Sequence, residues 1–156
     1  MKVALCSDHR GYRAKECVKT MLQRGGHQVE DFGCHDPTSC DYPDWAIPAS
    51  QSIAAGQSNV GIMFCGTGIG MSITANKVRG IRAALCHDEL TAELARKHND
   101  ANVLCLPADL VGEELMKRIV EVWFSTAFEG GRHTRRNEKI ARFERANESA
   151  TPSADA

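Results

Sequence analysis

The chain has 156 residues, of which 42% are hydrophobic and 25% charged, and its formal net charge at pH 7 is −1. These values are typical of one globular domain with a real hydrophobic core, and the near-zero charge argues against nucleic acid as a partner. The first residues enter an apolar run directly, so we expect no signal peptide, no transmembrane segment and no membrane partner.

Apolar runs and helical patterns alternate along the sequence. Short apolar runs predict strands at 2–6, 27–33, 60–64, 81–86 and 102–106. Apolar residues at helical spacing predict helices at 10–24, 43–55, 71–78, 88–97, 111–126 and 134–146. In the helix at 88–97, Leu90 and Leu94 are expected to face inward. The small polar residues at 149–156 predict a disordered tail, which leaves a single domain at 1–148.

This alternation predicts an α/β fold with three layers, α/β/α. We expect a Rossmann-like, open, five-stranded parallel sheet with an extra C-terminal helix. Ligands of such sheets bind outside the carboxyl ends of the strands. Asp8, His9, Cys65 and His87 all follow predicted strands, so they are expected at that edge.

Residues 59–77 contain the most informative pattern. An uncharged apolar run ends at Cys65, and a loop with three glycines then leads into a helix, which together form an anion-binding arrangement of backbone N–H groups. The dinucleotide fingerprint is excluded because Met71 stands where it needs glycine, and no P-loop triplet occurs. Cys65 is either a nucleophile or base activated by this loop, or a core cysteine beside a phosphate-binding loop.

The other candidate residues each have a structural and a functional interpretation. Asp8 and Thr67 could cap helices, and His9 could be a turn residue. His98 follows an apolar helical face, as a packed histidine at a helix end would. All four could equally line a site.

A basic cluster follows Gly130-Gly131. Such clusters usually form a solvated face, but the planar arginine fork also suits phosphate. Arg132 and Arg136 are four residues apart and therefore share one face of a helix that includes both.

The seven cysteines show no framework spacing, which predicts reduced thiols and a cytoplasmic protein. No C-x-x-C pair occurs, so we expect no structural zinc.

Six motifs, in order along 1–146, resemble the ribose-5-phosphate isomerase B family, which also includes galactose-6-phosphate isomerase subunits. They are Ser7-Asp8-His9, Asp41-Tyr42-Pro43, Cys65-Gly66-Thr67-Gly68-Ile69-Gly70 with Ala75-Asn76-Lys77, Gly80-Ile81-Arg82-Ala83, His98-Asn99-Asp100-Ala101-Asn102-Val103-Leu104 and Glu129-Gly130-Gly131-Arg132-His133. Each motif alone is weak, but the set is specific.

The resemblance implies an aldose–ketose isomerase for ribose 5-phosphate and ribulose 5-phosphate that needs no cofactor or metal. It implies that Cys65 is the base, that Thr67 contacts the reacting part of the sugar, and that His98, assisted by Asp8, opens the ring. It further implies a homodimer or dimer of dimers with shared active sites. The implied substrate-binding residues are Asp8, His9, Gly66, Thr67, Gly68, Ile69, Gly70, Asn99, Arg132 and Arg136.

Two alternatives stay open at this point. The chain could isomerise another sugar phosphate, such as allose or galactose 6-phosphate or a tetrose phosphate. It could also be a non-catalytic module that binds a sugar phosphate, although such a module needs no cysteine, threonine and histidine together.

The sequence departs from the family at Pro107-Ala108-Asp109, where many relatives carry Gly-Ala-Arg or Gly-Ser-Arg. Either Asp109 points away and Arg135 compensates for the missing cation, or Asp109 binds a hydroxyl of a different sugar phosphate. We expect the first, because the residues with chemical roles are all retained.

Overall fold

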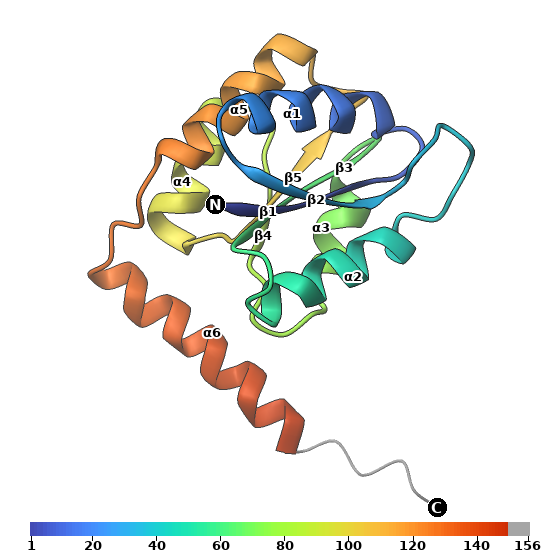
Figure 1. The fold of residues 1–156 in the computed structure, drawn as a ribbon. Helices are drawn as coiled ribbons and strands as arrows, with labels where there is room; N and C mark the ends of the chain where they lie inside the picture. The colour runs from blue at the N-terminus through green and yellow to red at the C-terminus, as the bar shows by residue number, and fades with distance from the viewer. Residues whose placement is uncertain (150–156) are drawn as a thin grey trace, which may run out of the picture.

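The computed structural model describes residues 1–149 and has three layers, with helices on both faces of one sheet (Figure 1). All strands are parallel, in the spatial order β2-β1-β3-β5-β4, so the predicted fold class is confirmed. The elements are β1 (Lys2–Ser7), α1 (Tyr12–Arg24), β2 (Gln28–Gly33), α2 (Pro43–Ala54), β3 (Val60–Cys65), α3 (Ile69–Ala75), β4 (Ala83–Leu85), α4 (Glu89–Asn99), β5 (Val103–Pro107), α5 (Glu113–Ser125) and α6 (Arg132–Ser149).

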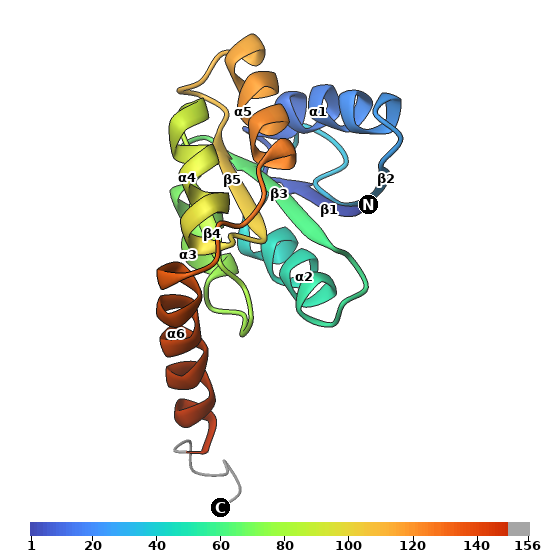
Figure 2. The ribbon, with the colours of Figure 1, turned by 90° about the vertical axis from the view of Figure 1, so that its left-hand side faces the viewer.

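Strand β3 lies at the centre of the sheet, and every one of its residues is buried. Its side chains alternate between two hydrophobic cores, as the pleat of a strand requires. Ile62 and Phe64 pack in the core that contains residues of α1, α4 and α5, whereas Met63 and Cys65 pack in the core that contains residues of α2 and α3. Figures 1 and 2 show α1 and α5 on one side of the sheet and α2 and α3 on the other. The thiol of Cys65 therefore belongs to the α2–α3 side.

Several predicted bounds shift in the structure. Helix α1 begins at Tyr12 instead of residue 10, because Oδ1 of Asp8 accepts hydrogen bonds from the N–H groups of Arg10 and Gly11, each at 2.9 Å, and so forms a turn before the helix. Strand β4 is shorter than predicted and lies at the edge of the sheet. Helix α6 begins two residues earlier, at Arg132, and ends at Ser149. The tail predicted at 149–156 otherwise lies outside the described residues.

The expectation that Leu90 and Leu94 face inward is wrong. These side chains are 62% and 37% exposed, and α4 buries Ala92 and Ala95 instead. Both pairs have helical spacing, so the periodicity alone does not decide which pair faces the core. Helix α4 consequently presents an apolar strip that the single chain leaves uncovered.

Helix α6 extends away from the body as an arm (Figures 1 and 2). Its Ile140 and Phe143 are 49% and 67% exposed, which is unusual for side chains of this size. Across residues 1–149, no helix has the length and apolar character needed to cross a membrane.

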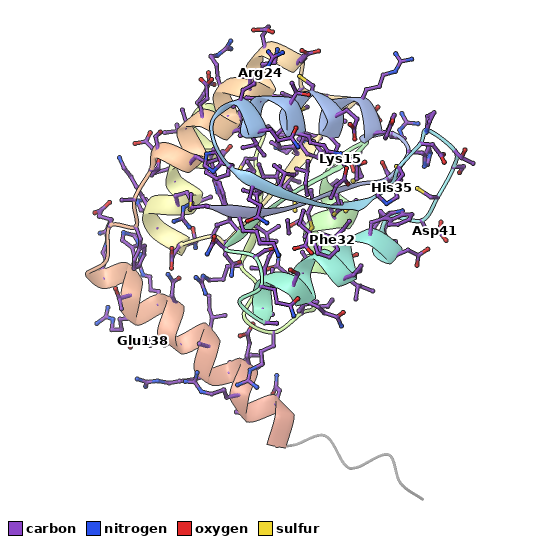
Figure 3. The ribbon with its side chains drawn as sticks, in the orientation of Figure 1. Lys15, Arg24, Phe32, His35, Asp41 and Glu138 are labelled. Atoms are coloured by element: carbon purple, nitrogen blue, oxygen red, sulfur yellow. The ribbon has the colours of Figure 1, made fainter. Side chains whose placement is uncertain are left out.

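A buried charge ties α1 to the edge strand β2. Lys15 is fully buried, and its Nζ lies 2.7 and 2.8 Å from the two carboxylate oxygens of Asp31. Lys15 extends from α1 towards the sheet (Figure 3), and Nζ of Lys19 lies 2.6 Å from the same carboxylate. Burial tends to raise the pKa of Asp31, but the hydrogen bonds from Lys15 and Lys19 outweigh it and hold that pKa below its ordinary value of 3.8.

Asp31→Asn should lower the free energy of unfolding at pH 7 by about 3 kcal/mol, because it leaves the buried Lys15 ammonium with only the partly exposed carboxylate of Glu16, whose Oε1 lies 3.1 Å from Nζ. Because the folded-state pKa of Asp31 is depressed, the carboxylate stabilises the fold above the unfolded-state pKa and loses this effect as the pH falls through the folded-state value. The difference between the two proteins in urea denaturation should therefore shrink below about pH 4. Lys19→Ala is the control and should cost about 1 kcal/mol or less, since Lys19 is partly exposed. Equal losses in the two variants at pH 7 would contradict the role given to Lys15.

Candidate active site

The glycine loop after β3 holds the thiol of Cys65 against a backbone amide. The N–H of Gly68 donates a hydrogen bond to Sγ of Cys65 at 3.1 Å, and the residue is only 5% exposed. Gly68 has a φ of 72°, in the left-handed region that favours glycine, and this turns its N–H back towards the strand. The sulfur is thereby held in a fixed position at the end of β3, against the loop.

The rest of the loop places a hydroxyl and the first N–H groups of α3 at the cavity, where they could bind a ligand. Thr67 is exposed at its tip, and its hydroxyl accepts a hydrogen bond from the N–H of Ile69 at 3.4 Å. Helix α3 starts at Ile69, and the first turn of a helix leaves N–H groups without acceptors inside the helix. Thr67 therefore both caps the turn and stands at the surface of the site.

A cavity of about 320 Å³ lies over this loop, at the carboxyl ends of the strands. Its walls come from the ends of β1, β3 and β5 and from the turn before α2, and its lining residues are Asp8, Arg10, Tyr42, Cys65, Gly66, Thr67, Gly70 and Asp109. A larger cavity of about 440 Å³ near Met1 and Phe124 contains no cysteine or carboxylate pair and lies away from the predicted motifs. The smaller cavity is the candidate active site on chemical grounds.

Asp8 forms a turn before α1 and is not the N-cap of that helix, which is Gly11; its role towards the substrate stays a prediction. Asp8 is 6% exposed and its Oδ1 holds the turn before α1, yet it also lines the cavity with Cys65. His9 turns towards the segment before α2, where its Nδ1 lies 3.3 Å from the backbone N–H and carbonyl of Cys40. It does not line the cavity among the described residues.

Arg10 and Asp109 meet across the cavity. Nε and Nη2 of Arg10 each lie 2.6 Å from Oδ2 of Asp109. Asp109 therefore does not point away from the site, and the cation next to it comes from the turn after β1. The expectation that Asp109 points away is wrong, because the ion pair with Arg10 holds its carboxylate at the cavity. Compensation by Arg135 of α6 stays a prediction.

The remaining predicted residues form a second group, apart from the cavity. His98 and Asn99 lie at the end of α4 and Arg132 and Arg136 in the first turns of α6. None of these four lines the cavity around Cys65 in the part of the chain that the structure describes. A single chain thus brings together Asp8, Cys65 and the glycine loop, and keeps the predicted ring opener and phosphate ligands elsewhere.

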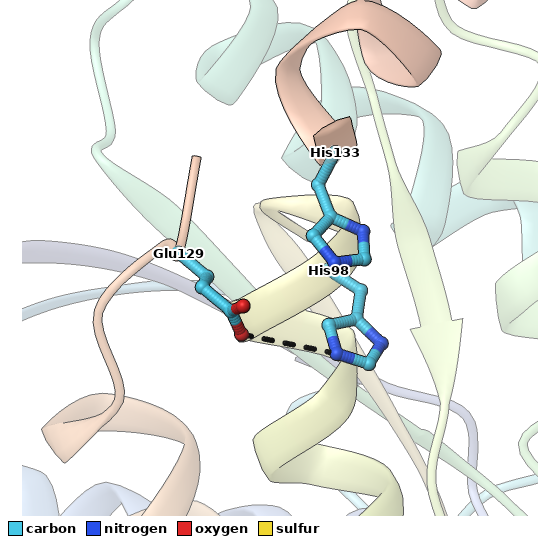
Figure 4. A group of neighbouring side chains, drawn as sticks. All are labelled: His98, Glu129 and His133. Carbon is cyan, nitrogen blue, oxygen red and sulfur yellow. Dashed lines mark ion pairs between the residues drawn. The ribbon is translucent and has the colours of Figure 1, made fainter. Parts of the chain in front are cut away.

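His98 stacks on His133 with the ring centroids 4.2 Å apart and the ring planes at 4° (Figure 4). Nε2 of His98 lies 4.0 Å from Oε2 of Glu129, and Nε of Arg132 lies 3.3 Å from Nε2 of His133. Burial lowers the pKa of His133, and the neighbouring His98 and Arg132 lower it further, which favours a neutral ring that accepts the Arg132 N–H. The sequence left the role of His133 open, and in the structure the His133 ring packs against the ring of His98.

His98, Glu129 and His133 offer ligand atoms that lie within 4.8 Å of one another. However, the lone pairs of two stacked imidazoles lie in parallel planes, so they do not converge on one ion at the 2.0–2.1 Å that zinc requires. This group is therefore better suited to orient His98 than to hold a metal.

A parallel α/β sheet with a thiol and a glycine loop at its carboxyl edge is suited to bind a small anionic ligand beside a sulfur. The pattern of the ribose/galactose isomerase family matches residues 3–140, and the chain belongs to that family. It is an isomerase. The resemblance inferred from the motifs is confirmed.

Three relatives show how close this relationship is. The structure of ribose-5-phosphate isomerase B from Clostridium thermocellum superimposes with a TM-score of 0.93 at 44% identity, covering 94% of this chain and 99% of that one. The structure of ribose-5-phosphate isomerase B from Mycoplasma genitalium with bound ribulose-5-phosphate superimposes with a TM-score of 0.89 at 39% identity. The match covers 92% of this chain and 96% of that one. A D-erythrulose-4-phosphate isomerase of Pectobacterium atrosepticum is 42% identical over 146 residues, which are 92% of this chain and 95% of that protein.

Gly68→Ala should destabilise the protein more than Gly56→Ala does. Both glycines have positive φ, 72° and 70°, which costs a residue with a side chain about 1–2 kcal/mol. A Cβ at residue 56 meets no atom within 4 Å, whereas at residue 68 it would contact Cδ1 of Leu85 and lie 3.2 Å from the carbonyl carbon of Leu106. We expect a further loss of about 1–3 kcal/mol for Gly68→Ala in urea denaturation. Similar losses would mean that the loop can shift without cost.

Proposed function

We propose that this isomerase interconverts ribose 5-phosphate and ribulose 5-phosphate through an enediolate. The observation that carries the proposal is the thiol of Cys65, which accepts the Gly68 N–H at 3.1 Å at the wall of a cavity it shares with Asp8. The names of the relatives from Clostridium thermocellum and Mycoplasma genitalium support this substrate.

In the proposed mechanism, the Cys65 thiolate removes the proton from the second carbon of the open-chain aldose. The electron pair of that C–H bond forms the carbon–carbon double bond, and the first-carbon carbonyl oxygen becomes negative. The N–H groups of the loop 66–70 that are not directed at the thiol or at Thr67 stabilise this oxygen. Each such donor contributes roughly 3–4 kcal/mol in enzymes where it has been removed. The thiol then returns the proton to the first carbon and becomes a thiolate again. The proton of the second-carbon hydroxyl passes to the negative oxygen on the first carbon, so that the ketone and the new hydroxyl form together. Thr67 hydrogen-bonds the reacting oxygens.

Ring opening and phosphate binding require residues that one chain keeps away from this cavity. We propose that a second copy supplies them, so that His98 and Asn99, with Arg132 and Arg136, reach the Cys65 cavity of a neighbouring chain. Three uncovered apolar strips support a homodimer or a dimer of dimers: Ile69 and Ile73 of α3, Leu90 and Leu94 of α4, and Ile140 and Phe143 of α6. Asp8 assists His98 in opening the ring, and His9 contributes to the phosphate end.

A second candidate substrate is a tetrose phosphate, because a relative with 42% identity is named a D-erythrulose-4-phosphate isomerase. Hexose 6-phosphates are the third possibility. The deciding experiment incubates the enzyme in deuterated water with a panel of aldose phosphates and measures the ketose formed and the deuterium at its first carbon. Ribose 5-phosphate should give the highest kcat/KM; a higher value for a tetrose phosphate would replace the substrate proposed here.

We also infer a reducing compartment, the cytoplasm. All seven cysteines are free thiols in the structure. Burial raises the pKa of Cys86 to about 11 and also raises that of Cys105, so these thiols stay protonated and unreactive.

Cys65→Ser should fold like the parent protein and lose most isomerisation, on the order of a thousandfold or more in kcat, because a serine hydroxyl does not ionise near neutral pH. Turnover is measured by the deuterium exchange described above, and folding by thermal denaturation. Cys17→Ser is the matched control, since Cys17 is partly exposed and lies outside the cavity. If the Cys65→Ser variant keeps near-normal turnover, Cys65 is not the base.

Mixing two inactive variants tests the shared site. If Cys65 of one chain works with His98 of another, refolding Cys65→Ser together with His98→Asn gives hybrid dimers with one intact site. Equal amounts should then recover about a quarter of the parent activity, because about half of the dimers are hybrid and each has one active site of two. If every site is built within a single chain, the mixture stays inactive, because no chain carries both residues.

A further inference from the structure

The ion pair between Arg10 and Asp109 lies directly on the glycine loop. Arg10 follows β1 and Asp109 follows β5, 99 positions later, yet a Cβ placed on Gly66 would lie 2.8 Å from Nε of Arg10 and would contact Oδ2 of Asp109. Gly66 follows Cys65, so the pair stands beside the reacting thiol. Only a residue without a side chain leaves room for the pair at this place.

Both halves of the pair are positioned by the backbone. The N–H of Arg10 donates to Oδ1 of Asp8 at 2.9 Å, and the N–H of Asp109 donates to the carbonyl of Gly66 at 3.0 Å. The side chains of Arg10 and Asp109 are 59% and 35% exposed, and ion pairs with this much exposure contribute little to folding stability. The contribution of this ion pair to folding stability therefore does not explain why an arginine side chain lies at the cavity.

The geometry leaves part of the guanidinium available to a ligand. Arginine has five N–H donors, and here Nε and Nη2 are directed to a single oxygen of Asp109. Nη1 and the second N–H of Nη2 remain for another acceptor. Within residues 1–149, Arg10 is also the one cation that lines the cavity, and the other charged lining residues, Asp8 and Asp109, are acidic.

We propose that Arg10 binds the phosphate of the sugar-phosphate substrate and that Asp109 is the residue that positions it. A phosphate monoester carries up to two negative charges and accepts the planar arginine fork better than a sugar hydroxyl does. Asp109 fixes the guanidinium through one edge and leaves the other edge towards the substrate. This inference rests on the proposed function and adds to it a phosphate ligand from the same chain as Cys65.

The first experiment measures KM and kcat for ribose 5-phosphate. Arg10→Ala should raise KM by about tenfold or more and change kcat by less than about threefold, the pattern of an interaction made equally in the ground state and the transition state. Arg10→Lys should recover part of the loss, because lysine keeps the charge but lacks the fork. Arg13→Ala is the matched control: Arg13 is an exposed arginine on α1 outside this cavity and should leave both constants unchanged. An unchanged KM in Arg10→Ala overturns the proposal.

A double-mutant cycle tests the positioning role of Asp109. Asp109→Ala should raise KM severalfold, and the double variant should match Arg10→Ala alone, because Asp109 acts only through Arg10. A lower KM in Asp109→Ala would mean that the carboxylate simply repels phosphate. Additive losses would mean that Asp109 contacts the substrate independently, for example through a hydroxyl. Either result overturns the positioning role.

Binding without turnover separates this inference from the proposed function. Ribitol 5-phosphate has no carbonyl and cannot be isomerised, and its affinity for the intact assembly is measured by titration calorimetry. Arg10→Ala should lower the affinity for ribitol 5-phosphate about tenfold or more. It should also make inorganic phosphate a weaker competitor of ribitol 5-phosphate. Unchanged competition by inorganic phosphate would assign Arg10 to a hydroxyl and overturn the proposal. If Arg10→Ala weakens the binding of both ligands but the parent enzyme incorporates deuterium into no sugar phosphate, the proposed function fails while Arg10 remains a phosphate-binding residue.

Discussion

Three backbone hydrogen bonds continue the sheet beyond the end of β3. The N–H of Asp8 donates to the carbonyl oxygen of Phe64 at 3.1 Å. On the other side of β3, the N–H of Ala108 donates to the carbonyl oxygen of Cys65 at 2.9 Å, and the N–H of Asp109 donates to the carbonyl oxygen of Gly66 at 3.0 Å. They follow directly from the register in which Ser7 pairs with Phe64 and Cys65 with Pro107. The turns after β1 and β5 therefore cannot move independently of the glycine loop. The sheet, through these bonds, fixes the positions of the acid, the thiol and the ion pair.

Charge is divided unequally between the two halves of the proposed site. The cavity around Cys65 has carboxylates at Asp8 and Asp109 and one cation at Arg10, so its lining has no excess of positive charge. A phosphate close to these carboxylates is repelled unless cations approach it, and a pair of unit charges 4 Å apart near a protein surface interacts by about 4 kcal/mol. The basic turn of α6, which carries Arg132 and Arg136, lies on an arm that extends from the body. A second copy that places this arm over the cavity would balance the charges.

The sequence was informative where interacting residues are neighbours in the chain. The strand, the loop and the helix around Cys65 were predicted because an apolar run and three glycines lie within a few residues, and the parallel sheet follows from the alternation of elements. It was not informative for Arg10 and Asp109, whose contact spans 99 positions. Leu90 and Leu94 were assigned to the core because two faces of α4 have the same periodicity. In the proposed shared site, His98 and Arg132 reach Cys65 from a second chain, and the pattern of one sequence contains no information on such a contact.

The environment of Cys65 distinguishes it from other thiols in the same core. Cys6, Cys65 and Cys105 lie on three adjacent strands and pack on the same side of the sheet. Burial raises the pKa of Cys6 and of Cys105 above their ordinary range, since their strand positions give the sulfur no donor that outweighs desolvation. Cys65 is the last residue of its strand, where the chain turns and the Gly68 N–H faces the sulfur. Three identical side chains thus differ in their surroundings, because among these three only Cys65 stands at the end of its strand, where a backbone N–H donates to the sulfur.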